Sequence, residues 1–201
     1  MITYQTIILA SWITFILVWG VLSVGVKKDI RGGFGGALSR MWLIRVAAVA
    51  IVLFVIVRIT TGTAHYARSM NAAFFADTLF ASPISLDWAG AVFAAVGIAC
   101  AIWARLYLGR NWSARPAVKE NHELVMAGPY AYVRHPIYTG IILATFGIAL
   151  TGAVIGIVMC IFSLIILSMR IPKEENIMLE LFPDAYPGYQ ARTKKLVPFV
   201  W

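Results

Sequence analysis

Residues 137–169 read IYTGIILATFGIALTGAVIGIVMCIFSLIILSM, a run without a charged side chain. A helix needs about 20 apolar residues to cross a bilayer, so this run is too long for one span and short for two. Thr151-Gly152-Ala153 interrupts it near the middle, where glycine suits a tight turn. The run predicts a helical hairpin, either two short tilted spans or a pair that does not fully cross the membrane.

Three further apolar runs precede this hairpin, at about 2–26, 41–61 and 88–108. The first is too long for a signal-peptide core and lacks a basic start, so we expect it to be a retained membrane helix. The composition agrees, because 61% of the 201 residues are hydrophobic and only 13% are charged. Together these features predict an all-α integral membrane protein of about five transmembrane helices, the last two forming the short hairpin.

Basic residues gather in alternate connections between these runs, and the positive-inside rule places such connections in the cytosol. We therefore expect a multi-pass protein with its N-terminus outside and its C-terminal tail inside, in the inner membrane of a bacterium or the endoplasmic reticulum of a eukaryote. Basic loops facing anionic lipid also account for the net charge of +8, so we expect no nucleic-acid partner. The residues concerned are Lys27, Lys28, Arg31, Arg40, Arg110, Arg115, Lys119, Arg134, Arg170, Lys173, Arg192, Lys194 and Lys195.

Polar side chains are dense in two segments, the connection before the hairpin and the tail after it. The connection ends in GPYAYVRHPIYTG, residues 128–140, which packs tyrosine, arginine and histidine against the apolar run. Polar groups at a membrane boundary are costly unless they are used. We therefore expect a cytosolic pocket formed by this connection and the tail. No cluster has metal-ligand spacing, so no metal is expected.

The polar segments carry an ordered set of motifs. GPY-x-x-x-RHP-x-Y-x-G begins at Gly128, R-x-x-x-EE at Arg170 and F-x-x-x-Y-x-x-Y at Phe182, with the apolar hairpin between the first two. This order resembles the isoprenylcysteine carboxyl methyltransferase family, which is related to the phospholipid N-methyltransferases. The resemblance covers about residues 100–201, so we divide the chain into N-terminal helices (1–90) and a methyltransferase core (91–201).

The resemblance implies that S-adenosyl-L-methionine is the cofactor and that the motif residues bind it. His122 and His135 resemble the family's cofactor-contacting histidines, and Asn111 and Trp112 are candidates for the entrance of the pocket. The remaining cofactor-binding candidates are Leu124, Val125, Gly128, Tyr130, Tyr138, Glu175, Tyr186 and Tyr189. Gly128 suits a turn better than a contact, and Pro136 suits the first turn of a helix. The catalytic candidates are Arg134, Arg170, Glu174 and Glu175.

Several of these residues have structural alternatives. The tyrosines suit an interfacial aromatic belt, the arginines can snorkel to lipid phosphates, and the tail can form an amphipathic surface helix. Glu174 and Glu175 follow Pro172, a good helix-start residue, so capping a new helix is an alternative for both. Adjacent helical positions point in different directions, so we expect one glutamate, Glu175, to face the donor with the other in support.

The chemistry itself needs few groups. A carboxylate accepts a methyl group without a general base, whereas an amine must first lose a proton. The favoured interpretation is a carboxyl methyltransferase acting on an isoprenylcysteine-like or isoprenoid acceptor that enters from the bilayer. A lipid-amine N-methyltransferase and an NADPH-dependent sterol-type reductase remain alternatives. Glycines at 147, 152 and 156 permit close packing within or between chains, so the oligomeric state stays open.

Overall fold

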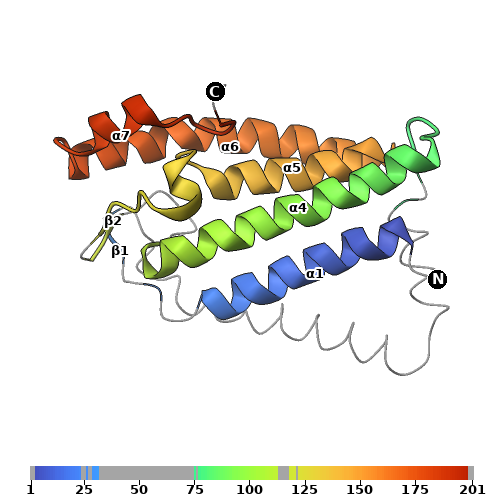
Figure 1. The fold of residues 1–201 in the computed structure, drawn as a ribbon, viewed down its shortest axis with the longest axis horizontal. Helices are drawn as coiled ribbons and strands as arrows, with labels where there is room; N and C mark the ends of the chain where they lie inside the picture. The colour runs from blue at the N-terminus through green and yellow to red at the C-terminus, as the bar shows by residue number, and fades with distance from the viewer. Residues whose placement is uncertain are drawn as a thin grey trace.

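The computed structural model describes residues 3–23, 26, 29–31, 75, 77–112, 118–120 and 122–198. Four helices in this part lie side by side along the long axis of the molecule (Figure 1). They are α1 (Tyr4–Leu22), α4 (Ile84–Leu108), α5 (Pro136–Leu150) and α6 (Val154–Leu181). The expected span at 41–61 lies outside the described residues.

Three of these helices, α1, α4 and α6, are long and apolar enough to cross a membrane. The fourth, α5, has 15 residues, which at 1.5 Å per residue gives roughly 22 Å. Large apolar side chains of α6, including Val158, Ile161 and Phe162, are exposed on the surface of the bundle. Such a surface suits lipid, and the helical membrane protein expected from the sequence is confirmed.

The short elements gather at one end of the bundle. They include α7 (Tyr186–Arg192), the 3-10 helices η1 (Gly109–Asn111) and η2 (Gly128–Ala131), and the strands β1 (Asp29–Arg31) and β2 (Val118–Lys119). The two strands pair antiparallel, with Asp29 opposite Lys119. This short two-stranded ribbon was not expected in an all-α protein. It forms where two connections that are far apart in the sequence meet, so the sequence pattern of either connection alone does not predict it.

The hairpin turns where the sequence predicts. α5 ends at Leu150, α6 begins at Val154, and Gly152 adopts φ +74°, a left-handed conformation that glycine tolerates best. The segment before α4 pairs with this turn, since Leu79 N donates to Gly152 O at 2.8 Å and Val154 N donates to Asp77 O at 2.9 Å. The turn is therefore held at the far end of the bundle from α7 (Figure 1).

The second arm of the hairpin is longer than expected. α6 continues through Pro172 to Leu181, so the predicted helix start at Pro172 is wrong, and only α5 is short. An interior proline removes a backbone hydrogen bond. Ile171 and Glu175 are both buried on either side of it, and this packing holds the helix together across the proline.

α4 and α5 pack closely through small residues. A methyl group added at Gly97 would lie 2.5 Å from Gly140 O, and one added at Gly90 would lie 2.4 Å from Gly147 O. Ala94, also in this seam, is fully buried. Small residues let helix backbones approach, as is common in membranes. α4 begins at Ile84 and so spans the expected division at 90/91.

Candidate active site

A cavity of about 140 Å³ lies at the end of the bundle that carries α7. Its wall comes from the end of α4, the connection after it, the start of α5, the distal part of α6, and α7. The lining residues are Leu108, Asn111, Trp112, His122, Glu123, Leu124, Val125, Tyr130, Arg134, His135, Ile137, Tyr138, Glu174, Ile177, Met178, Tyr186 and Tyr189.

Most residues expected from the sequence meet in this wall. Both histidines, all four tyrosines, Leu124, Val125, Arg134 and Glu174 line it, as do the entrance candidates Asn111 and Trp112. Three expected residues are outside the wall: Gly128, Arg170 and Glu175. Gly128 has φ +62° and packs on the Tyr107 ring, so it serves the turn into η2.

The Arg134-His135-Pro136 segment is fixed by the tail. Pro136 is the first residue of α5, as the sequence predicts, because its ring suits the first helical turn. Arg134 N donates to Lys194 O at 2.8 Å, and His135 N donates to Lys195 O at 3.1 Å. The tail therefore forms one side of this segment and joins the two polar parts of the chain, as expected.

Glu174 is one of two carboxylates in the cavity wall, together with Glu123. Its Oε1 accepts from the Tyr138 hydroxyl at 2.5 Å and from Arg170 Nη2 at 3.1 Å. Its Oε2 lies 3.6 Å from His135 Nδ1. The sequence analysis expected Glu175 to face the donor; in the structure Glu174 lies in the cavity wall and Glu175 does not. Arg170 is coupled to the wall through Glu174, one turn along α6.

Glu175 lies behind the wall in a second network. Its Oε1 accepts from Arg134 Nε at 2.7 Å and lies 3.4 Å from His135 Nε2. Its Oε2 accepts from Gln190 Nε2 at 3.4 Å. Arg134 Nη1 also donates to Gln190 O at 3.1 Å and to Thr193 O. Arg134 was expected to hold an anionic ligand group, and the structure gives it these protein partners.

His135 lies between the two carboxylates. Its ring stacks on Tyr138, with centroids 5.5 Å apart and planes 5° apart. Burial lowers the pKa of His135, but its hydrogen bonds and charge interactions with Glu174 and Glu175 outweigh burial and raise it above 6.5. The two carboxylates therefore favour the protonated imidazole and make it a weaker proton acceptor.

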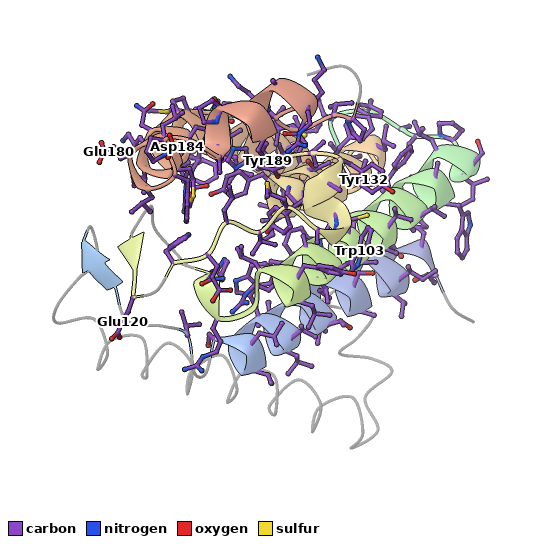
Figure 2. All side chains as sticks on the ribbon, turned by 60° about the vertical axis from the view of Figure 1, so that its left-hand side comes forward. Trp103, Glu120, Tyr132, Glu180, Asp184 and Tyr189 are labelled. Atoms are coloured by element: carbon purple, nitrogen blue, oxygen red, sulfur yellow. The ribbon has the colours of Figure 1, made fainter. Side chains whose placement is uncertain are left out.

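Three tyrosines of the wall, Tyr130, Tyr186 and Tyr189, lie outside the spanning helices and are neutral at physiological pH. Burial raises the pKa of Tyr130 and Tyr186, and raises that of Tyr189 to about 12. Tyr189 donates to Tyr130 O at 2.7 Å, which connects α7 to η2. Figure 2 shows Tyr189 toward the middle of the molecule, while Glu180 and Asp184 lie at its outer edge. Buried aromatic faces beside a carboxylate suit a cationic ligand.

Four apolar residues of the wall, Leu108, Ile137, Ile177 and Met178, were not predicted. The last two follow Glu174 by three and four positions, so they share its helix face. Helical continuation past Pro172 would have identified both from the sequence. The four residues give the cavity apolar surface beside its charged groups.

Arg105 supports this wall from beneath and was also not predicted. It is 1% exposed, with Nη1 donating to Gly109 O at 2.6 Å and Nη2 donating to Leu22 O at 2.5 Å. Its guanidinium carbon lies 4.7 Å from the centroid of the Trp112 ring. The sequence did not indicate a role for Arg105, because its partners lie in α1 and η1 and the sequence near Arg105 does not show that contact with α1.

The fold and the site define a helical integral membrane protein with a pocket of buried ion pairs at one end of its bundle. The isoprenylcysteine carboxyl methyltransferase (ICMT) family model matches residues 90–180. Over these residues, which are fewer than half of the chain, the sequence is similar to that family.

Relatives and a solved structure show the same similarity. The chain is 34% identical over 104 residues to protein-S-isoprenylcysteine O-methyltransferase of Schizosaccharomyces pombe, covering 48% of this chain and 43% of that protein. It is 32% identical over 84 residues to protein-S-isoprenylcysteine O-methyltransferase B of Arabidopsis thaliana, covering 41% of this chain and 43% of the relative. The chain thus spans less than half the length of these relatives.

The fold is similar to that of a eukaryotic intramembrane Ras methyltransferase, ICMT. The TM-score is 0.52 at 22% identity, covering 83% of this chain and 70% of the other. At this identity the likeness establishes the fold, and residue roles must come from the pocket itself.

Proposed function

We propose that this protein is an integral membrane methyltransferase that uses S-adenosyl-L-methionine to methylate the carboxylate of a lipophilic acceptor. The acceptor would be isoprenylcysteine-like or isoprenoid. The single observation behind the proposal is the Glu174 cluster, in which one wall carboxylate is held by Tyr138 and Arg170 beside His135.

The pocket residues fit the methyl donor. Its sulfonium is a cation, which the Glu174 carboxylate and the rings of Tyr138, Tyr186 and Tyr189 complement. His122 and Asn111 offer polar groups, and Leu108 and Val125 offer apolar surface for a purine. When bound, S-adenosyl-L-methionine supplies an electrophilic methyl group. The residues bind and orient the reactants, which accounts for much of the rate of such displacements.

The charges of the site favour a carboxylate acceptor over an amine. An amine needs a group that takes its proton, but Glu174 and Glu175 favour the protonated form of His135 and are themselves held by Arg170 and Arg134. Among the described residues, Arg170 Nε is a buried donor without a partner. We propose that this N–H orients the acceptor carboxylate, while Glu174 keeps Arg170 in place.

The apolar side of the pocket supports lateral entry of the acceptor. Ile137 belongs to α5, and Ile177 and Met178 belong to α6, so lipid-facing helices supply this side. We propose that the acceptor tail reaches the pocket from the bilayer. A bulky side chain on this apolar side, such as Ile177→Trp, should reduce turnover at saturating donor more than it weakens donor binding. Weaker donor binding without a loss of turnover at saturating donor would count against this route.

Charge at the two ends of the bundle supports an active site on the cytosolic side. The pocket end carries basic residues, among them Lys173, Arg192, Lys194 and Lys195, while Asp77 and Asp87 lie near the opposite end. By the positive-inside rule the pocket and the tail face the cytosol. A cysteine introduced at Lys194 should react with an impermeant reagent only after the membrane is opened.

Donor binding is the first test. Calorimetry on the detergent-purified protein should show binding of S-adenosyl-L-methionine and none of NADPH. Glu174→Gln should weaken donor binding, whereas Glu180→Gln, at an exposed position of the same helix, should not. Binding of NADPH instead would move the protein to the reductase class.

Methyl transfer then identifies the acceptor group. The protein, labelled donor and a farnesylated cysteine with a free carboxylate should give a product that releases labelled methanol in alkali, as an ester does. The matching carboxamide should give none. Alkali-stable label on phosphatidylethanolamine would instead show an N-methyltransferase.

A further inference from the structure

Helix α7 carries two tyrosines of the pocket wall but is too short to be stable alone. It has seven residues, and isolated helices below about 12 residues are marginal in water. Gly188 within it weakens it further. Tyr186 and Tyr189 are nevertheless only 3% and 4% exposed. Contacts from other elements must therefore hold α7 against the cavity.

Arg134 supplies contacts at the C-terminal end of α7. Its Nη1 donates to Gln190 O at 3.1 Å and to Thr193 O. The last carbonyls of a helix lack partners within it, and a cation there complements the helix dipole. Arg134 thus caps α7 from the segment that precedes α5.

Glu175 fixes Arg134 and also reaches α7 directly. The Arg134–Glu175 pair is 2.7 Å long, and its side chains are 7% and 10% exposed. The other oxygen of Glu175 accepts from Gln190 Nε2 at 3.4 Å. The Nε and Nη1 groups of Arg134 are both directed to these protein partners, and Glu175 is not part of the cavity wall.

We propose that Arg134 and Glu175 are positioning residues that hold α7 over the pocket and thereby set the affinity for the methyl donor through Tyr186 and Tyr189. The assignment of the pocket to that donor rests on the proposed function. Neither residue touches the acceptor. Their effect on the reaction passes through the placement of the two tyrosines.

A double-mutant cycle tests this role. Arg134→Gln and Glu175→Gln should each raise the Kd for S-adenosyl-L-methionine roughly ten- to a hundredfold, as expected for a lost hydrogen bond to a charged group. The Kd of the double variant should not exceed that of the single variant that binds the donor less tightly, because both substitutions break one shared contact. At saturating donor, kcat should fall less than about threefold. Arg134→Lys keeps the charge without the planar fork, so it should be intermediate and remain folded.

Hydrogen exchange without donor tests the placement of α7 itself. Backbone amides of residues 186–193 should exchange faster in Arg134→Gln and Glu175→Gln, while those of 137–150 stay unchanged. Lys173→Gln is the control, because it removes a positive charge from an exposed position on α6 that is not part of the cavity wall. It should change neither exchange nor Kd.

Two results would overturn the proposal. One is a large loss of kcat at saturating donor with unchanged Kd and unchanged α7 exchange, which would place Arg134 on the acceptor. The other is equally faster exchange over 137–150, which would mean general destabilisation. If the unaltered protein fails to bind the donor, the proposed function is wrong, and the exchange comparison alone decides whether these residues hold α7.

Discussion

The hydroxyl of Tyr138 donates to Oε1 of Glu174 at 2.5 Å and so joins the first turn of α5 to the distal part of α6. The two helices are arms of one hairpin whose turn, at Gly152, lies at the opposite end of the bundle. Arg170 Nη2 reaches the same oxygen at 3.1 Å. One carboxylate oxygen therefore connects both arms at the pocket.

Glu174→Gln should lower kcat/KM roughly a hundredfold, in the range for removal of a positioned charge from an active site. Gln keeps the shape but leaves Arg170 and His135 facing a neutral group, and it removes the negative charge beside the donor site. Labelled methyl transfer to a farnesylated cysteine measures the effect. Glu180→Gln is the matched control, and equal activity of the two variants would remove Glu174 from the proposed mechanism.

The pKa of His135 makes a prediction about stability and pH. The folded-state pKa is raised above 6.5 by Glu174 and Glu175. Its contribution is therefore fully present below about pH 6.5 and is lost as pH rises through the folded-state value, by at most about 1.4 kcal/mol per pH unit. Thermal unfolding in detergent from about pH 6 to about pH 9 should show stability falling, and His135→Gln should flatten this slope. If His135→Gln leaves the slope unchanged, another titrating group causes the change of stability with pH.

The sequence predicted those parts of the site that depend on local pattern. Pro136 starts α5 and Gly152 turns the hairpin, because the backbone preferences of proline and glycine act within a few residues. The motif order also identified His135, Tyr138 and Tyr186 as residues that the pocket brings together.

Contacts between distant segments explain what the sequence missed. Pro172 indicated a helix start, but burial of Ile171 and Glu175 keeps α6 continuous, and this continuity exchanges the orientations expected for Glu174 and Glu175. Local propensity is a weak guide where tertiary packing opposes it. Arg105 was missed for a related reason, since its carbonyl partners lie on α1 and η1.

The α4–α5 seam predicts strong sensitivity to a single methyl group. Gly97→Ala would place its Cβ 2.5 Å from both Gly140 O and Ala144 N, so backbone must move, at about 1–3 kcal/mol for such overpacking. Gly20→Ala, on α1, meets nothing within 4 Å and should stabilise by roughly 0.5–1 kcal/mol. Thermal unfolding of both variants in one detergent provides the comparison. Equal midpoints would mean that the two helices are not in close contact in the membrane.

Arg105 predicts that the N-terminal helix and the pocket are energetically coupled. Arg105→Leu removes the hydrogen bonds to Leu22 O and Gly109 O and the guanidinium beside Trp112. We expect a loss of roughly 3 kcal/mol, since hydrogen bonds from charged groups contribute about 1.5–3 kcal/mol each. Donor affinity should fall as well, because Trp112 lines the cavity.

The matched control for this prediction is Arg110→Leu, at an exposed position one turn further along the chain, in η1. It removes the same charge from an exposed position, so it should change the unfolding midpoint and the Kd for S-adenosyl-L-methionine less than Arg105→Leu does. If Arg105→Leu lowers the midpoint but leaves that Kd unchanged, Arg105 stabilises the bundle without shaping the pocket. If both variants behave alike, the contact with Leu22 O contributes nothing, and α1 is not coupled to the site through this residue.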